Sequence, residues 1–258
     1  MLIDTRSMGK VLTGEGAMPL GRENQLLAAL PATVYKNWKG ELVLRELKQG
    51  QSLNLNRKQG EVYFPISCAI AIYATHGMAR RSFMRFVGSS FAAGPVNMMS
   101  TDEITFDGVV CGSGYALTIP SKVISRSIDT PSLTSEAPAI AMARTAKGGL
   151  VIAQCVGTHT NKQRLARLLL QAKDCFGENR PITLTQKLWG ELLMARRETA
   201  AEILAEWSHD GTIESRRGAI YVRNIDNLKK ASCECYAWIQ QSYLDEFKLW
   251  KSILWHSA

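Results

Sequence analysis

The sequence predicts an α+β fold in which an antiparallel β-domain is followed by a long helix and a winged helix-turn-helix. Three observations support this prediction. Glycines recur through residues 40–120, with short apolar runs between them. From Ala137 to Val156 the chain becomes rich in small and aliphatic residues and poor in charge. Between Thr183 and Val222, two helical patterns joined by a short turn precede a hairpin pattern.

The composition is that of a globular protein. The 258 residues, 46% hydrophobic and 21% charged, suffice for one large domain or two ordinary ones and exclude a disordered chain or a fibrous rod. The formal net charge of +8 permits a nucleic-acid partner. The apolar stretch around residues 66–74 is too short to cross a bilayer, and the N-terminus carries no apolar signal segment. We therefore expect a cytoplasmic protein with no membrane partner.

Residues 1–22 are expected to form a flexible N-terminal arm, and residues 23–130 a β-domain. A short helix is predicted at Glu23–Leu30. Apolar runs bounded by turn residues then predict strands at Leu42–Leu47, Glu61–Phe64, Ala69–Ala74, Ser82–Val87, Ile104–Cys111 and Tyr115–Ile119. Short strands at this spacing are typical of an antiparallel sandwich or barrel.

Residues 131–159 are predicted to form a long connecting helix. Its apolar side chains follow a helical spacing and would share one face. That face either packs on the β-domain or pairs with its copy in a dimer. The residues expected on it are Met142, Ala146, Leu150, Ala153 and Val156.

Residues 160–236 are predicted to form the winged helix-turn-helix domain. A helix at Asn161–Cys175 is expected to end at Gly177, a favourable residue just after a helix. Thr185 is a suitable N-cap for the next helix, which is expected to reach Leu193.

The second helix of the helix-turn-helix pattern is predicted at Arg196–Trp207, after a short turn at Met194-Ala195. Its apolar residues have the i, i+3, i+4, i+7 spacing of a core face. A hairpin is then predicted at Thr212–Val222, with its turn at Arg217-Gly218.

This pattern predicts an interface with double-stranded DNA. The start of the second helix can enter the major groove, where Arg and Glu can read base edges. The start of the first helix and the tip of the hairpin are placed to contact phosphates. The predicted DNA-binding residues are Thr185, Gln186, Lys187, Arg196, Arg197, Glu198, Thr199, Arg216 and Arg217.

An alternative is a winged helix that makes only protein contacts. Glu198, Glu202 and Glu206 place three carboxylates on the proposed reading helix. If all three faced DNA, they would repel its phosphates. The residues alone leave this alternative open.

Several short motifs stand in one order along residues 23–236. They are Asn24–Pro31, Tyr63–Pro65, Gln163–Leu170, Leu184–Gln186, Arg196–Thr199, Arg217–Ile220 and Ala231–Tyr236. Together with the order of the predicted domains, they resemble the Crp/Fnr family of bacterial transcription regulators. The resemblance implies a β jelly roll, or double-stranded β-helix, that acts as a sensor. It also implies a homodimer joined through the long helix, with RNA polymerase as a further partner.

The same resemblance places the base-reading residues at Arg197 and Glu198, with a basic residue one turn later. This chain has Glu202 at that third position. It also has Met194 where the family usually carries glycine in the turn. These departures indicate either a changed operator or a degenerate member that senses a ligand or binds a protein without specific DNA binding.

The β-domain differs from the cyclic-nucleotide-binding members of the family. Those members hold the phosphate with a Gly-Glu turn and a nearby arginine, because a buried phosphate needs a charged partner. Here the corresponding turn, Val87–Pro95, has serine in place of the acid, and no Lys or Arg occurs between Arg85 and Lys122. We therefore expect no response to cyclic AMP of the familiar kind.

Neither a metal site nor another cofactor is predicted, and no residue is assigned a catalytic role. The cysteines are dispersed and are expected to be reduced. Cys155 and His159 have a spacing that can hold a metal on one helix face, but packing is the preferred interpretation. The pair Cys233 and Cys235 has no second pair at metal-finger spacing. A jelly-roll enzyme would need a histidine cluster, and the β-region has only His76.

Residues 237–258 are expected to form a C-terminal helical extension. Large apolar residues recur there at about helical spacing, namely Trp238, Tyr243, Phe247, Trp250 and Leu254. We predict a short helix packed on the body of the protein, with a partner-binding helix as the alternative.

Overall fold

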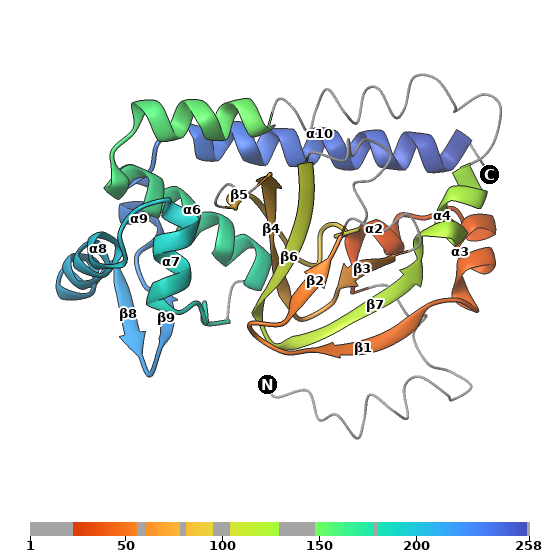
Figure 1. The fold of residues 1–258 in the computed structure, drawn as a ribbon, viewed down its shortest axis with the longest axis horizontal. Coiled ribbons are helices and arrows are strands. Elements are labelled where there is room, and N and C mark those ends of the chain that lie inside the picture. Colours follow the sequence, from red (N-terminus) through yellow and green to blue (C-terminus); the bar gives the residue numbers. More distant parts are fainter. Residues whose placement is uncertain are drawn as a thin grey trace.

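A computed structural model describes residues 23–55, 60–77, 81–94, 104–128, 148–177 and 180–256 of the chain. The β-domain forms one half of the molecule and the helix-turn-helix the other, with a long C-terminal helix lying along both (Figure 1). The predicted arm at residues 1–22 lies outside the described residues. In the part of the chain that the structure covers, no helix is both long and apolar enough to cross a membrane.

The β-domain is built from two antiparallel sheets. One has the order β1-β7-β3 and the other the order β2-β6-β4-β5. The strands are β1 (Val43–Leu47), β2 (Ser52–Asn54), β3 (Glu61–Pro65), β4 (Ala69–His76), β5 (Ser82–Val87), β6 (Ile104–Gly112) and β7 (Gly114–Pro120). Leu47 and Ala116 of the first sheet share a buried cluster with Leu53, Ile70 and Val110 of the second. The two sheets therefore pack face to face, as the strand pattern predicted.

Three short helices border the sheets. They are α2 (Gln25–Ala28), α3 (Ala32–Lys39) and α4 (Ser121–Ile128), of which the sequence analysis anticipated only α2. Asn24 is buried and caps α2, since its Oδ1 accepts hydrogen bonds from the Leu26 and Leu27 backbone amides. Its amide nitrogen donates to the carbonyl oxygens of Pro65 and Phe91, at 3.0 and 2.8 Å. One buried side chain thus joins α2 to the β-domain.

The connecting segment is described only in part. A helix covers residues 148–158, within the range predicted for the long helix, and residues 131–147 lie outside the described residues. Met142 and Ala146 of the predicted apolar face fall there. After the helix, Thr160 begins α6 (Asn161–Phe176) with a capping box, because its hydroxyl accepts from the Gln163 amide while the Gln163 side chain accepts from the Thr160 amide.

The remaining elements form the helix-turn-helix, its hairpin and the C-terminal helices. They are α7 (Gln186–Leu193), α8 (Arg197–His209), β8 (Ile213–Arg216), β9 (Ala219–Val222), α9 (Ile225–Ala231) and α10 (Cys235–His256). The chain ends α6 at Gly177 with a φ of 89°, a left-handed conformation that favours glycine.

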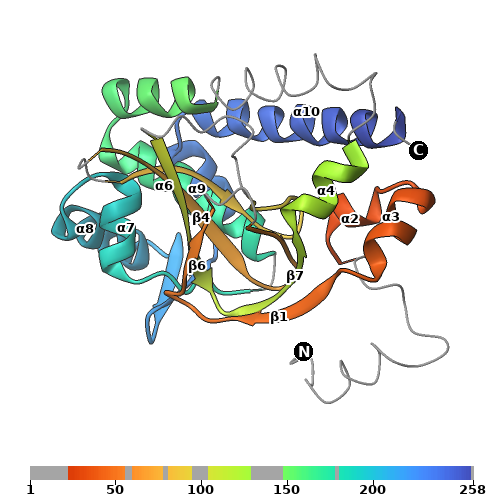
Figure 2. The ribbon, with the colours of Figure 1, turned by 45° about the vertical axis from the view of Figure 1, so that its right-hand side comes forward.

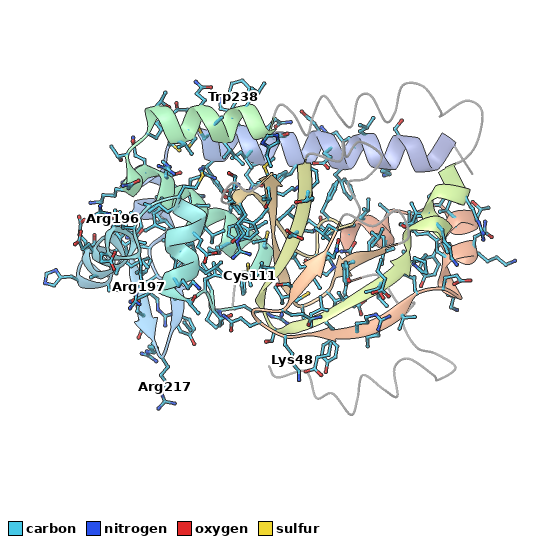
Figure 3. The ribbon with its side chains drawn as sticks, in the orientation of Figure 1. Lys48, Cys111, Arg196, Arg197, Arg217 and Trp238 are labelled. Carbon is cyan, nitrogen blue, oxygen red and sulfur yellow. The ribbon has the colours of Figure 1, made fainter. Side chains whose placement is uncertain are left out.

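One apolar core joins the two halves of the molecule. Tyr73 and Phe83 of the sheet share it with Leu169 of α6 and Trp189 of α7, and each of these side chains is at most 1% exposed. Figure 3 shows Cys111 near the centre of the molecule, close to where the sheet meets the helices. The β-domain and the helix-turn-helix are therefore packed against each other.

The C-terminal helix α10 is longer than expected, since it contains 22 residues. Figure 2 shows it running from the helix-turn-helix half towards α4 at the far side of the β-domain. There Arg85 of β5 donates to Glu246 at 2.7 Å, and the two side chains are only 19% and 15% exposed. The Arg85 guanidinium also lies over the rings of Phe91 and Tyr243, at 4.8 and 4.4 Å from their centres. Tyr243 and Phe247 thus pack on the body as predicted, whereas Trp238, which was expected to pack as well, is 58% exposed.

Replacing Glu246 by glutamine should destabilise the protein, because Arg85 would keep its buried charge and lose its counter-charge. We expect a decrease in the free energy of unfolding of about 1–3 kcal/mol, less than for a fully buried pair because both side chains keep some exposure. Urea denaturation followed by tryptophan fluorescence measures it. Asp245→Asn removes the same charge one residue away and should cost less than about 0.5 kcal/mol. Equal effects of the two variants would contradict the role given to this ion pair.

Candidate nucleic-acid interface

The helix-turn-helix is formed by α7 and α8, and local signals set both helices. Thr185 caps α7, since its hydroxyl oxygen accepts from the Leu188 amide at 3.2 Å. Between the helices Met194 adopts the left-handed conformation, with φ 52° and ψ 41°. The helices approach closely at Gly190, where an added Cβ would lie 3.1 Å from the Cα of Arg197. A side chain at residue 190 would therefore push α8 away from α7.

The start of α8 is exposed while its other face is buried. Ala200 and Trp207 are at most 2% exposed and lie in the shared core. Arg196, Arg197 and Glu198 are exposed, and Thr199 is half-buried. Arg196 occupies the N-cap position without forming a side-chain cap, so its guanidinium is not held by the helix end. The first turn of α8 thus presents its side chains to solvent, as the sequence pattern predicted.

The predicted residues of α7 lie beside those of α8. Thr185, Gln186 and Lys187 are exposed at the start of α7. The Gln186 side chain accepts a hydrogen bond from Nη2 of Arg197 at 3.4 Å. The structure therefore brings the start of α7 and the start of α8 into one surface.

The hairpin β8–β9 turns at Arg217 and Gly218, with φ values of 49° and 80°. Positive φ at both positions is typical of a type I′ hairpin turn. Arg216 and Arg217 are exposed, and Figure 3 shows the Arg217 side chain pointing away from the body at the hairpin tip, on the same half of the molecule as Arg196 and Arg197. All nine predicted DNA-binding residues thus lie on the helix-turn-helix and its wing.

Arg223 is a further basic residue of this surface that the sequence analysis did not select. It follows β9, is exposed, and donates through Nε to Glu214 at 2.9 Å. Arg216 also forms an ion pair with Glu214. The hydrogen bond from Arg223 and then that from Arg216 hold the pKa of the Glu214 carboxyl below its usual value. Part of the positive charge of the wing is therefore compensated within the hairpin.

The acidic residues of α8 are less of an obstacle to DNA than their number suggests. Glu206 forms an ion pair with Lys162 of α6, so its charge is partly balanced within the protein. Glu198 and Glu202 are exposed nearer the start of the helix. Of the three carboxylates of α8 that the structure describes, Glu198 and Glu202 are therefore the ones nearer the surface formed by the starts of α7 and α8.

The glycine-rich turn of the β-domain is covered in part by the chain itself. The Gln25 amide donates to the Ser89 carbonyl oxygen at 2.8 Å. Gly88 lies against α6, since an added Cβ would be 2.7 Å from the Cα of Cys175. Arg85, which precedes the turn, is paired with Glu246. Arg85, Gly88 and the Ser89 carbonyl are therefore engaged in contacts within the protein, while Ser90 is exposed.

Residues that could hold a metal are gathered elsewhere. Cys155, His159, Cys233 and Cys235 lie together at the joint between helix 148–158, α9 and α10, and their donor atoms are all within 4.8 Å of one another. The contact with the Cys233 thiol is the largest effect on Cys155 and lowers its pKa. The fold thus brings Cys155 and His159 together with Cys233 and Cys235, the second pair that the sequence spacing lacked, and the three cysteines also share a small buried cluster.

Residues 163–231 match the model of the Crp-like helix-turn-helix domain. This segment contains every predicted DNA-binding residue. No curated protein sequence matches the chain.

Several solved structures share the fold. A protein described as a transcriptional regulator of the Crp/Fnr family from Eubacterium rectale is 16% identical, with a TM-score of 0.57 over 81% of this chain and 98% of its own. FixK2 from Bradyrhizobium japonicum is 13% identical, with a TM-score of 0.58 over 74% and 98%. The c-di-GMP-responsive global regulator CLP from Xanthomonas campestris is 14% identical, with a TM-score of 0.52 over 74% and 99%.

The geometry of the turn between α7 and α8 can be tested at Met194, the residue with the left-handed conformation. Met194→Gly should raise the free energy of unfolding by about 0.5–1 kcal/mol, because glycine adopts positive φ without steric cost. Ala195→Gly is the matched control and should lower it by about 0.5 kcal/mol, since residue 195 does not have positive φ. Urea denaturation measures both. A loss of stability in Met194→Gly would contradict the turn described here.

Two independent comparisons thus agree with the geometry. The family match covers the helix-turn-helix, and the structural likeness extends over the β-domain as well. Two of these three solved structures are described as regulators. The chain carries a Crp-like helix-turn-helix DNA-binding domain on the fold of the Crp/Fnr family of transcriptional regulators, as its motifs predicted.

Proposed function

We propose that the protein is a sequence-specific transcription regulator that binds double-stranded DNA as a homodimer. The observation that supports this most directly is the single surface formed by Arg196, Arg197 and the start of α7, with Arg217 projecting from the same half of the molecule. A regulator of this kind also has RNA polymerase as a predicted partner.

DNA recognition would use the exposed start of α8 in the major groove. Arg197 can donate twice to guanine, and Glu198 can accept from cytosine. The hydrogen bond from Arg197 to Gln186 holds the guanidinium near the start of α7, whose exposed residues would contact the phosphate backbone. Arg217 at the wing tip would add a contact on the flanking DNA.

A second copy of the chain is the proposed occupant of an exposed apolar strip. Leu150 and Val156 are 70% and 36% exposed on helix 148–158, and Trp238 and Leu244 are 58% and 56% exposed on α10. These helices lie side by side in both ribbon views (Figures 1 and 2). Exposed apolar side chains gathered on adjacent elements are typical of protein interfaces. Of the predicted dimer residues, Leu150 and Ala153 are exposed on this part of the surface.

The protein is also proposed not to respond to cyclic AMP in the familiar way. Arg85 is the last cation before the turn, and it is held by Glu246 and by the rings of Phe91 and Tyr243. A phosphate would have to displace this carboxylate from a largely buried position. The turn itself carries Ser89 where an acidic residue would be needed.

The alternative is a degenerate regulator that makes only protein or ligand contacts. The feature that favours it is Glu202, which is exposed one turn after the proposed reading residues. Selection of bound fragments from genomic DNA distinguishes the two. Enrichment of a near-palindromic sequence, with affinity falling steeply as salt rises, supports the regulator. Weak binding without sequence preference at all salt concentrations would support the alternative.

Arg197→Ala should weaken binding to the selected operator by about 1–3 kcal/mol, or roughly 5- to 150-fold, and relax specificity at one position of each half-site. Fluorescence anisotropy with operator and scrambled duplexes measures both effects. Arg126→Ala removes the same charge from an exposed site on α4 in the β-domain and should leave the affinity within twofold. Unchanged affinity in Arg197→Ala would exclude the role given to this residue.

Leu150→Glu should convert the dimer into a monomer, because it buries a carboxylate in the proposed apolar interface. Light scattering coupled to size-exclusion chromatography should show the mass falling to the 28.5 kDa of a single chain. Lys36→Glu, on exposed α3, changes the charge elsewhere and should leave the dimer intact. A Leu150→Glu variant that stays dimeric would show that the chains associate through another surface.

A further inference from the structure

Four metal-binding side chains meet where three helices join. Cys155 and His159 stand four residues apart at the end of helix 148–158, so they share one face. Cys233 follows α9, and Cys235 is the first residue of α10. The three thiols are at most 5% exposed, and the His159 side chain is 13% exposed. Segments 78 residues apart in sequence thus supply one cluster.

The backbone between the helices shapes the second half of this cluster. Ser232 is extended, with φ −77° and ψ 156°, and ends α9. The Tyr236 amide then donates to the Cys233 carbonyl oxygen at 3.1 Å. This turn directs both cysteines towards the end of helix 148–158.

We propose that Cys155, His159, Cys233 and Cys235 bind one Zn²⁺ ion in a closed structural site. The Sγ atoms of Cys155 and Cys233 are 3.6 Å apart, and Sγ of Cys235 is 3.7 Å from Nδ1 of His159. Ordinary Zn–S and Zn–N bond lengths in a tetrahedron place sulfur atoms about 3.8 Å apart and sulfur and nitrogen about 3.6 Å apart. These two distances therefore match the spacing of a tetrahedral site, and all the donor atoms lie within 4.8 Å of one another.

The orientation of His159 fits this role. Its Nδ1 faces Cys235, and its Nε2 lies 3.2 Å from the Glu234 carboxylate. A zinc-bound histidine commonly donates its other ring N–H to a carboxylate, which fixes the ring and strengthens it as a ligand. Nδ1 also lies 3.3 Å from the Thr158 hydroxyl, but that hydroxyl donates its proton to the Gln154 carbonyl oxygen at 2.8 Å. With the ring proton on Nε2, the lone pair of Nδ1 is available to a ligand at the cluster.

The charge of the surroundings also favours the metal. Three thiolates, one neutral imidazole and Zn²⁺ carry a net charge of −1. Arg164 and Arg167 of α6 are 6% and 2% exposed, act electrostatically on Cys155, and each leaves a buried Nε without a hydrogen-bond partner in the described protein. Buried guanidinium groups need a nearby negative charge. The zinc thiolate site would provide it.

The spacing favours one ion over an iron–sulfur cluster. In a cluster the ligands are distributed over different irons and separated by the inorganic core. Here all four donor atoms lie within 4.8 Å of one another, which suits a single tetrahedral centre. Because four protein ligands fill a tetrahedron, no position is open for catalysis, and the site is structural.

The ion would tie the joint at His159 and Thr160, where helix 148–158 gives way to α6, to the start of α10. If the proposed function is correct, the ion fixes the direction of the proposed dimer helix relative to the DNA-binding domain. Metal content can be measured without DNA, so the two proposals fail independently.

The test begins with the full-length protein purified under reducing conditions from zinc-supplemented cells. Inductively coupled plasma mass spectrometry should find one zinc ion per chain. After the zinc is removed, titration with Co²⁺ alone should produce the intense visible absorption of a tetrahedral thiolate site, saturating at one equivalent. In the zinc-loaded protein, the three cysteines of the cluster should be protected from a thiol reagent and become reactive on chelation, whereas the buried Cys68 and Cys111 should stay unreactive in both forms.

Variants identify the ligands. Cys155→Ser and Cys233→Ser should each lose at least tenfold in zinc affinity, measured by competition with a chromogenic chelator. Cys175→Ala, which changes a cysteine outside the cluster, should retain one zinc. His159→Cys should also retain it, because four thiolates form an equally good zinc site, whereas His159→Ala should not.

The proposal is overturned if the parent protein binds neither Zn²⁺ nor Co²⁺ under reducing conditions. It is also overturned if the purified protein carries a Cys155–Cys233 disulfide that accounts for the protected thiols. Should the serine variants fail to fold, the Co²⁺ spectrum of the parent and the comparison of His159→Ala with His159→Cys still decide the question.

Discussion

The apolar surface of α6 joins the two halves of the molecule, because it is buried on nearly every side. Leu165, Leu168 and Leu169 are fully inaccessible, with the β4–β5–β6 face of the sheet and the helix-turn-helix packed around them. At the end of α6, Gly88 and Gly112 leave room for Cys175 and Phe176. Burial of apolar side chains is the main favourable term in folding. Because α6 packs against both the sheet and the helix-turn-helix, it fixes the position of α8 relative to the β-domain.

Much of the fold follows from local patterns in the sequence. The six predicted strands are confirmed to within two residues at each end, because each is a half-buried run bounded by turn residues. The strand β2 was missed, since three residues are too few to show a period. Helix α3 was also missed. It begins without a side-chain cap and contains Thr33, Val34 and Tyr35, and burial of Trp38 against Phe64 stabilises it instead.

The candidate DNA interface was predictable for the same reason. The Thr185 cap, the turn at Met194 and the hairpin turn at Arg217 are each local signals that span only a few neighbouring residues. The metal cluster and the Arg85–Glu246 ion pair were not predictable, because their partners are 78 and 161 residues apart. Periodicity identifies which side chains share a helix face, but only the folded chain determines which faces meet.

The helix α10 gives the two halves of the molecule a second connection. It starts at Cys235 in the metal-binding cluster, and its 22 residues extend about 33 Å, as far as Glu246 and Phe247 on the β-domain and beyond. Near its start, Tyr236 donates to Asp174 of α6 at 2.9 Å. Two bodies joined at separate points lose most of their freedom to rotate about either one. A signal from the β-domain would therefore reach the DNA-binding half as a coupled tilt of α6 and α10. A change that releases the contacts of one helix alone would leave the other helix still restraining the rotation of the two halves.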